Sequence, residues 1–115
     1  MLVVEDELLI RWSIVETLSN AGWVVTEAGD AASALRAAET GPFNAIVLDY
    51  RLPDSNDLGL LAALKARLPK TAVIMMSAFG TPEVVQQARA LGVIGFLDKP
   101  FEMEALRTLL VSDRV

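Results

Sequence analysis

The sequence predicts an α/β fold in which helices cover both faces of an open, doubly wound parallel sheet. Short apolar runs alternate with segments of helical periodicity five times along the 115 residues. The apolar runs are continuous, which is typical of parallel strands buried on both faces. A closed βα barrel would need about eight such units and about 250 residues. We therefore expect one domain over residues 1–115, and its 53% hydrophobic and 22% charged residues exclude intrinsic disorder.

The N-terminal part of the chain predicts two strands with a helix between them. Leu2–Val4 is a short apolar run, and Trp23–Ala28 is rich in the β-branched and aromatic residues that strands favour. The segment Glu7–Ala21 carries apolar residues at helical spacing, which are Ile10, Ile14, Leu18 and Ala21. Gly22 follows them and is expected to end the helix.

The central part predicts a helix, a strand and a second helix. Asp30 is a good N-cap for an Ala-rich helix through Glu39, and Gly41-Pro42 breaks that helix. Ala45–Leu48 is a continuous apolar run that ends in Asp49, so we expect a strand there. After a polar loop over residues 52–57, a helix that ends before Pro69 is marked by Leu61, Leu64 and Leu68.

The last part predicts two strands, Ala72–Met76 and Ile94–Leu97, each followed by a helix. Thr81-Pro82-Glu83 is a strong helix start, because it combines a cap, a proline at the first position and an acid in the first turn. The final helix is expected to face inward through Met103, Leu106, Leu109 and Leu110. Five other large apolar residues are interpreted as packing residues: Trp12, Trp23, Val84, Val85 and Leu91.

Composition excludes several classes of function. The chain has no cysteine and no histidine, so disulfides, thiol or imidazole catalysis and Cys- or His-ligated metal sites are excluded. The net charge of −5 argues against direct nucleic-acid binding, which needs clustered Lys and Arg. No apolar stretch is long enough to span a membrane. We therefore expect a cytoplasmic protein that contacts neither membrane nor nucleic acid.

The residues that can carry chemistry directly follow the predicted strands. They are Glu5 and Asp6, Asp49, Ser77, and the run of Asp98, Lys99 and Pro100. Sites in open parallel sheets lie at the carboxyl ends of strands, so neighbouring strands would bring these groups together. Two like charges about 4 Å apart repel by about 4 kcal/mol at an effective dielectric near 20. A compensating cation is therefore expected, and a few carboxylates with room for water suit Mg²⁺.

Such a pocket makes Asp49 a candidate nucleophile towards a phosphoryl group. The cation and Lys99 would share the charge of the phosphoryl oxygens, and Ser77 would donate a hydrogen bond to one of them. Each residue alone also has a structural explanation, as a solvated cap pair for Glu5 and Asp6, a polar strand end, a turn hydroxyl or a surface charge. Their joint placement at four strand ends favours the site.

Four motifs, in this order and spacing, resemble those of the receiver domain of two-component response regulators. They are Val3-Val4-Glu5-Asp6-Glu7, Ile46-Val47-Leu48-Asp49-Tyr50-Arg51-Leu52-Pro53, Met75-Met76-Ser77-Ala78 and Phe96-Leu97-Asp98-Lys99-Pro100-Phe101. The resemblance covers essentially the whole chain, and four motifs in order are far more specific than any one of them. It implies a flavodoxin-like sheet with strand order 2-1-3-4-5.

The resemblance also implies roles for the residues in these motifs. Asp49 would accept a phosphoryl group from a sensor histidine kinase, so that the domain catalyses its own phosphorylation and dephosphorylation and is not otherwise an enzyme. The Mg²⁺ ligands would be Asp6, Asp49, the backbone carbonyl of Arg51 and, through water, Glu5. Lys99 would pair with the phosphoryl group and precede a cis Pro100. Ser77 and Phe96 would act as the switch, and the face of the fourth helix, fifth strand and fifth helix would change its partners.

Some positions depart from or refine this resemblance. Asp57 follows Asn56 where the family has glycine, which concerns the shape of that loop and not the chemistry. Arg51 and Phe79 stand where side chains tune phosphorylation rates in the family. The stretch 77–83 resembles receivers of AAA+ enhancer-binding transcription activators. The implied partners are therefore a fused or separate effector domain, with transcription as the output, and a second copy in a homodimer formed on phosphorylation.

Three other functions fit the residues less well. A phosphotransferase or phosphatase with an aspartate nucleophile needs a second Asp two residues on, where this chain has Arg51. A flavodoxin-like FMN binder needs a phosphate loop after the first strand, and there Glu5, Asp6 and Glu7 would repel the phosphate. A degenerate receiver that acts only as a docking module would not need the reactive residues. The complete set is present here and argues against this function: Glu5, Asp6, Asp49, Ser77 and Lys99.

Overall fold

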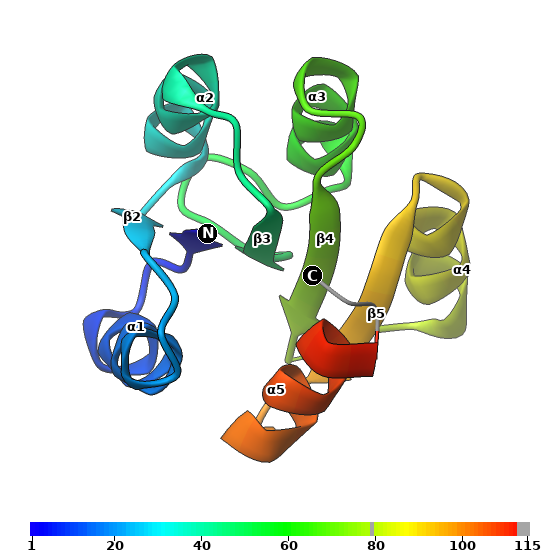
Figure 1. Ribbon diagram of the computed structural model, residues 1–115. Helices are drawn as coiled ribbons and strands as arrows, with labels where there is room; N and C mark the ends of the chain where they lie inside the picture. The colour runs from blue at the N-terminus through cyan, green and yellow to red at the C-terminus, as the bar shows by residue number, and fades with distance from the viewer. Residues whose placement is uncertain (79, 113–115) are drawn as a thin grey trace.

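The computed structural model describes residues 1–78 and 80–112, and in these residues the chain forms a parallel sheet with helices on both faces (Figure 1). The strands are β1 (Leu2–Val4), β2 (Thr26–Ala28), β3 (Ala45–Asp49), β4 (Ala72–Ser77) and β5 (Val93–Asp98). The helices are α1 (Leu8–Asn20), α2 (Ala31–Thr40), α3 (Gly59–Arg67), α4 (Pro82–Ala90) and α5 (Met103–Ser112). The strand order β2-β1-β3-β4-β5 confirms the predicted topology.

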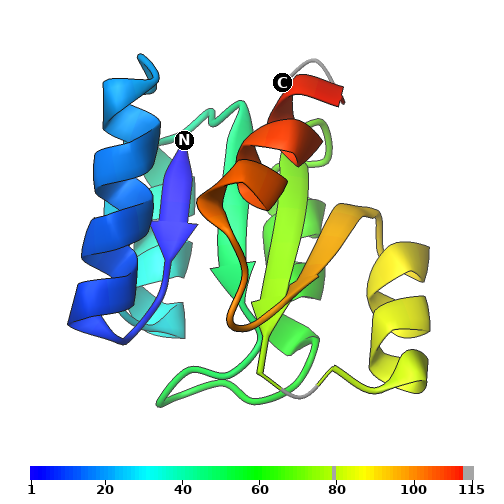
Figure 2. The ribbon, with the colours of Figure 1, turned by 90° about the horizontal axis from the view of Figure 1, so that it is seen from below.

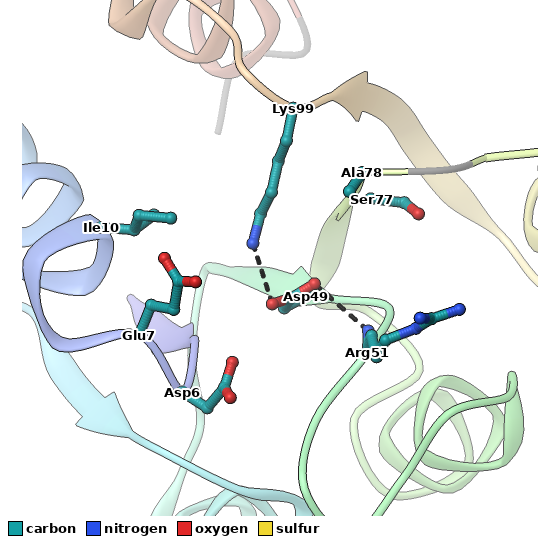
Figure 3. A pocket seen from close by; sticks show the side chains of 8 residues that line it. All are labelled: Asp6, Glu7, Ile10, Asp49, Arg51, Ser77, Ala78 and Lys99. Carbon is teal, nitrogen blue, oxygen red and sulfur yellow. Dashed lines mark hydrogen bonds and ion pairs between the residues drawn. The ribbon is translucent and has the colours of Figure 1, made fainter.

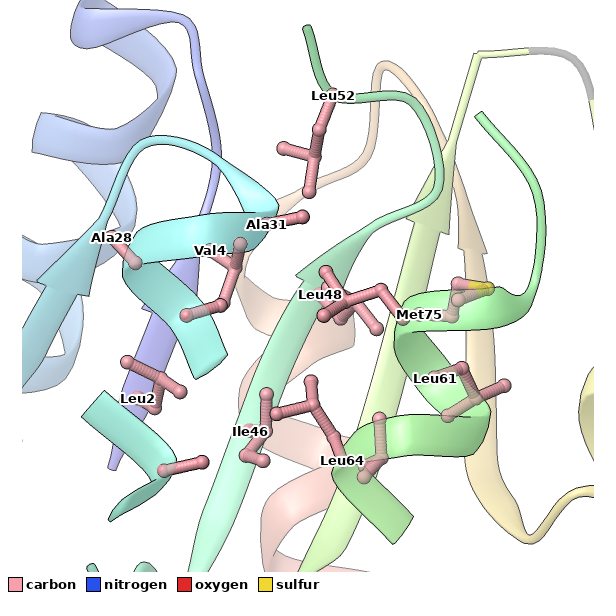
Figure 4. Packing of buried hydrophobic residues seen from close by; sticks show 14 of the residues in the cluster. Leu2, Val4, Ala28, Ala31, Ile46, Leu48, Leu52, Leu61, Leu64 and Met75 are labelled. Atoms are coloured by element: carbon pink, nitrogen blue, oxygen red, sulfur yellow. The ribbon is translucent and has the colours of Figure 1, made fainter. Parts of the chain in front are cut away.

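Two apolar layers hold the sheet between its helices. Helices α1 and α5 cover one face, and α2, α3 and α4 cover the other (Figures 1 and 2). Successive residues of β3 point to opposite layers: Ile46 and Leu48 pack towards α2 and α3, whereas Ala45 and Val47 pack towards α1 and α5 (Figure 4). Because both faces are buried, the strand is apolar at consecutive positions. Each fully buried aliphatic side chain contributes about 1.5–3 kcal/mol.

The predicted helix starts are present as capping hydrogen bonds. Asp30 accepts a hydrogen bond from the Ser33 backbone N–H at 2.7 Å, and Thr81 accepts one from the Val84 backbone N–H at 3.2 Å. Pro82 is the first residue of α4, where its missing N–H has no consequence. Both of these caps confirm the boundaries expected from the sequence.

The second strand is shorter than expected. The prediction of a strand over Trp23–Ala28 is wrong for its first three residues, because β1 offers only Leu2–Val4 as pairing partners for Thr26–Ala28. The chain just before β2 is held differently, since the N-terminal ammonium of Met1 donates to the Val24 carbonyl at 2.8 Å. Pairing length is thus limited by the neighbouring strand and not by the β-propensity of Trp23 and its neighbours.

Two apolar residues lie at the surface against expectation. Trp12 is 60% exposed, because it stands two residues, or about half a helical turn, from both Ile10 and Ile14 on the inward side of α1. Leu91 is 38% exposed and follows the last residue of α4. Trp23 does pack against the α1–α5 layer, and Val84 and Val85 are half-buried. Within the described part of the chain no helix is long and apolar enough to cross a bilayer.

Candidate functional site

The carboxyl ends of β1, β3, β4 and β5 surround one pocket of about 250 Å³ (Figure 3). It is lined by Asp6, Glu7, Ile10, Asp49, Arg51, Ser77, Ala78 and Lys99. The strand register creates this arrangement. Val4 pairs with Leu48, so Glu5 follows beside Asp49, and Ser77 pairs with Asp98, so Lys99 follows beside them. The predicted convergence of the strand ends is therefore confirmed, although Glu5, Asp98 and Pro100 do not themselves line the pocket.

Three carboxylates meet at this pocket: Asp6 and Asp49 line it, and Glu5 is buried behind its lining. One oxygen from each of Glu5, Asp6 and Asp49 can be chosen so that all lie within 4.8 Å of one another. Glu5 is fully buried, Asp49 is 5% exposed and Asp6 is exposed. Like charges this close repel, and burial removes the water that would screen them. The trio therefore needs positive charge nearby.

Lys99 supplies part of that charge. Its Nζ lies 2.7 Å from Glu5 Oε1 and 2.9 Å from Asp49 Oδ2, and Figure 3 shows the side chain reaching across to Asp49. The Lys99 backbone N–H donates to the Ser77 carbonyl at 2.8 Å, which fixes where the side chain begins. The other oxygen of Asp49, Oδ1, accepts a hydrogen bond from the Arg51 backbone N–H at 3.2 Å. Both oxygens of the predicted nucleophile are thus oriented.

The surroundings of Glu5 and Lys99 shift the pKa values of both side chains. Burial raises the pKa of Glu5 to about 8, and the neighbouring Asp49 adds to the rise while Lys99 opposes it. Burial alone would lower the pKa of Lys99, but its hydrogen bonds with Glu5 and Asp49 outweigh that effect and raise the pKa above its usual value. Lys99 therefore stays cationic, and without a bound cation Glu5 is largely protonated at neutral pH.

The chemistry of the pocket fits a hard divalent cation. Glu5 Oε2 is buried and has no hydrogen-bond partner among the described residues. When Glu5 is ionised, this oxygen must accept from water or face a cation, because a buried carboxylate oxygen without either is costly. The donor set consists of carboxylate oxygens with space for water, which suits ions such as Mg²⁺ and Ca²⁺. The residues present therefore fit a metal at Glu5, Asp6 and Asp49.

The remaining predicted residues lie around this pocket. Ser77 is buried and lines it, and the Arg51 side chain extends away from Asp6 (Figure 3). Phe96 is half-buried outside the pocket, where a Cβ built on Gly80 would come within 2.7 Å of its ring. The Lys99–Pro100 bond is cis, as expected. Phe79 lies outside the described residues.

Comparison with protein families decides what kind of domain this is. The family model of the response regulator receiver domain matches residues 1–111. This chain is a response regulator receiver domain. The resemblance that the four motifs predicted is confirmed over essentially the full length of the chain.

Individual relatives of this receiver domain agree with that assignment. The transcriptional regulatory protein FixJ of Bradyrhizobium diazoefficiens is 32% identical over 110 residues, which are 96% of this chain and 54% of FixJ. The receiver domain of NtrX from Brucella abortus is 36% identical with a TM-score of 0.84, covering 98% of this chain and 94% of that one. A Burkholderia pseudomallei response regulator with a phosphorylated aspartic acid, calcium ion and citrate has a TM-score of 0.87 at 25% identity. The match covers 98% of this chain and 68% of that one. The chain thus spans about half the length of FixJ.

One residue that supports the site of this receiver domain was not foreseen. Arg11 on α1 donates from Nη1 to the Glu5 backbone carbonyl at 2.8 Å, and its Nε lies 3.1 Å from Glu27 Oε1. It therefore ties the segment that carries Glu5 and Asp6 to both α1 and β2. The helical spacing of α1 places Arg11 beside Ile10, but no feature of the sequence indicates that it reaches a backbone carbonyl.

Proposed function

We propose that this receiver domain, taken as residues 1–115, is a phospho-accepting signalling switch. In this proposal Asp49 takes a phosphoryl group from a sensor histidine kinase in a Mg²⁺-dependent reaction. The single observation that carries the proposal is the environment of Asp49. It is a nearly buried carboxylate whose two oxygens are oriented by Lys99 and the Arg51 N–H, beside two further acids and a buried hydroxyl. The phosphorylated aspartic acid of the Burkholderia relative supports the same chemistry.

Each residue of the pocket has its own role in phosphoryl transfer to Asp49. A carboxylate oxygen of Asp49 attacks phosphorus, a P–O bond forms, and the bond from phosphorus to the donor nitrogen breaks with its electrons leaving on that nitrogen. Lys99 faces the charge that gathers on the phosphoryl oxygens, and the Ser77 hydroxyl donates to one of them. Asp6, Asp49, the Arg51 carbonyl and, through water, Glu5 would hold Mg²⁺, which would supply positive charge to offset that of the same oxygens. The domain would thereby catalyse its own phosphorylation, and in this proposal the same residues also serve its dephosphorylation, in which water attacks phosphorus and the Asp49 carboxylate leaves.

The output is proposed to follow from movement of Ser77 and Phe96. Ser77 ends β4 and Phe96 lies in β5 against Gly80, so a shift of the β4–α4 segment would change the space beside the aromatic ring. The α4–β5–α5 face would then change its partners, which include a second copy of the domain and an effector domain, fused or separate. The transcriptional regulators among its relatives support transcription as the output.

The first test is intact-mass spectrometry after incubation with Mg²⁺ and a small-molecule phosphodonor. We expect one phosphoryl adduct per chain, and no adduct when EDTA replaces Mg²⁺. A folded protein that never gains the adduct would contradict the proposal. It would favour the second candidate, a docking module, because such a module needs no competent phosphoacceptor.

An apolar groove beside the pocket supports protein docking by the phosphodonor. This groove of about 450 Å³ shares Ile10, Ala78 and Lys99 with the acidic pocket. Leu9 of α1 lines this groove, and the same helix also exposes the large apolar side chains of Leu8 and Trp12. The i, i+3 and i, i+4 spacing of these three residues places them on one face of the helix. A protein that brings a phosphohistidine to Asp49 would pass this surface, so we propose that the kinase contacts it.

Trp12→Ala is therefore expected to slow transfer from the phosphorylated sensor kinase by about tenfold or more, since exposed tryptophans often dominate interfaces. Phosphorylation by a small-molecule donor should change less than about twofold, because Trp12 does not line the pocket. Val24→Ala is the matched control, as Val24 is 86% exposed and lies before β2, at the opposite ends of the strands. Equal loss with both donors would show that Trp12 acts on the fold and not on docking.

A further inference from the structure

The turn that follows Asp49 is fastened to a helix outside the pocket. The Leu52 N–H donates to the Ser55 carbonyl at 2.7 Å, and the Ser55 N–H donates back to the Leu52 carbonyl at 3.2 Å. Pro53 takes the second position of this turn, which its fixed φ suits. Asp54 is at the tip, and its carboxylate accepts from the Ala31 N–H at 2.7 Å and the Ala32 N–H at 3.1 Å.

Two aspartates thus cap the same helix from different segments. The N-terminus of α2 has free N–H groups and a partial positive charge, both of which favour carboxylates. Asp30, the N-cap residue, accepts from the Ser33 N–H within its own segment. Asp54 satisfies the first two N–H groups of the helix, and it comes from 23 residues further along the chain. Asp30 therefore stabilises α2 alone, whereas Asp54 also joins α2 to the β3–α3 loop.

The geometry of one peptide bond connects this contact to the acidic pocket. The Arg51 carbonyl and the Leu52 N–H belong to one planar trans unit, so they point in opposite directions. The Ser55 carbonyl holds the Leu52 N–H, and the turn that Asp54 fastens therefore determines where the Arg51 carbonyl points. The Leu52 side chain is 5% exposed in the core, and Asp49 holds the Arg51 N–H from the other side.

We propose that Asp54 is a positioning residue for the cation site, which orients the Arg51 carbonyl by fastening the turn of residues 52–55 to the N-terminus of α2. The inference rests on the proposed function, in which that carbonyl is a cation ligand. Asp54 is not expected to touch the cation, because both of its oxygens are occupied by the Ala31 and Ala32 N–H groups.

The test is a Mg²⁺ titration followed by backbone amide shifts in NMR spectra, with Asp30→Ala as the matched control. Loss of a group that directly orients a metal ligand commonly weakens metal binding by about 10- to 100-fold. Asp54 orients the Arg51 carbonyl only indirectly, through the turn of residues 52–55. We therefore expect Asp54→Ala to raise the Mg²⁺ Kd about 3- to 10-fold. Asp30→Ala should leave the Kd within about twofold of the wild type, because it removes a cap of the same helix without releasing the turn. Thermal melting should show a loss of stability in both variants, larger for Asp54→Ala because Asp54 accepts two hydrogen bonds from α2 and Asp30 accepts one.

Asp54→Asn provides a milder comparison should Asp54→Ala fail to fold. The amide offers one acceptor oxygen instead of two, so the Mg²⁺ Kd should rise by about twofold or more, while Asp30→Asn should leave it unchanged. Equal Mg²⁺ Kd values for the Asp54 and Asp30 variants would overturn this inference and leave the proposed function intact. A wild-type domain that binds no Mg²⁺ would overturn the proposed metal site, and this inference with it.

Discussion

Asp49→Asn is expected to abolish the phosphoryl adduct while leaving the domain folded. A carboxamide is not a nucleophile towards phosphorus under these conditions, yet it is nearly the same size as the carboxylate. Its oxygen can still accept from either the Arg51 N–H or Lys99 Nζ, which lie 3.2 and 2.9 Å from the Asp49 oxygens. Lys99 also keeps Glu5 at 2.7 Å. One lost hydrogen bond predicts a stability change of about 1 kcal/mol.

Intact mass and thermal melting of the variant, each with Mg²⁺ and a phosphodonor, check this expectation. Asp57→Asn is the matched control, since Asp57 lies in the loop that follows Asp49 but its carboxylate accepts from the Gly59 N–H and does not line the pocket. The control should gain one adduct at the wild-type rate. An adduct that persists in Asp49→Asn would place phosphorylation on another residue. A variant that fails to fold would show that Asp49 is chiefly structural.

The positions of the strand-end residues could be predicted because they depend only on topology. Parallel strands place all their carboxyl ends at one edge, so the chain order alone brings Asp49, Ser77 and Lys99 together. Continuous apolar runs indicated β1, β3, β4 and β5, and helical spacing or capping residues indicated the helices, whereas β2 was predicted from β-propensity and covers only Thr26–Ala28. The capping contacts of Asp30 and Thr81 were equally accessible, because they join residues three apart.

Contacts between distant segments could not be predicted in this way. The bonds from Ala31 and Ala32 to Asp54, and from Arg11 to the Glu5 carbonyl, depend on the packing of loops, for which the sequence carries no periodic pattern. The complete burial of Glu5 was also not evident, because an acid after a short strand is ordinarily solvated. The exposure of Trp12 was also not predicted, because it depends on where the inward face of α1 is centred around the helix.

The buried carboxyl of Glu5 is expected to make the Mg²⁺-free domain less stable as the pH rises. Its pKa is about 8 in the folded chain, against an ordinary value of 4.5. Between these values the unfolded chain has lost the proton and the folded chain keeps it, so the folded state binds more protons. The free energy of unfolding then falls with rising pH, by up to about 1.4 kcal/mol per pH unit for this group. The contribution is complete below the lower pKa and is lost as the pH passes through the upper one.

Glu5→Gln should remove this dependence. Glutamine keeps an oxygen that can accept from Lys99 but carries no charge to desolvate, so we expect the variant to be about 1–3 kcal/mol more stable than the wild type near pH 8 without Mg²⁺. The difference should shrink towards about pH 5, where the folded wild type is protonated as well. Urea unfolding in EDTA between about pH 5 and pH 8 measures the free energy of unfolding of both proteins. Glu7→Gln, a change at an exposed acid of the same pocket, should keep the wild-type slope.

Adding Mg²⁺ is expected to narrow or reverse the difference in stability between these two proteins. A cation held by the ionised carboxylates stabilises the folded wild type, by about 2.7 kcal/mol at 100 times its Kd, and it does so more strongly as the pH rises because it competes with the Glu5 proton. Glu5→Gln removes one of three acids within 4.8 Å, so the variant should gain much less. If the wild type and Glu5→Gln gained equally from Mg²⁺, Glu5 would not belong to the cation site, and its burial would be only a cost in stability.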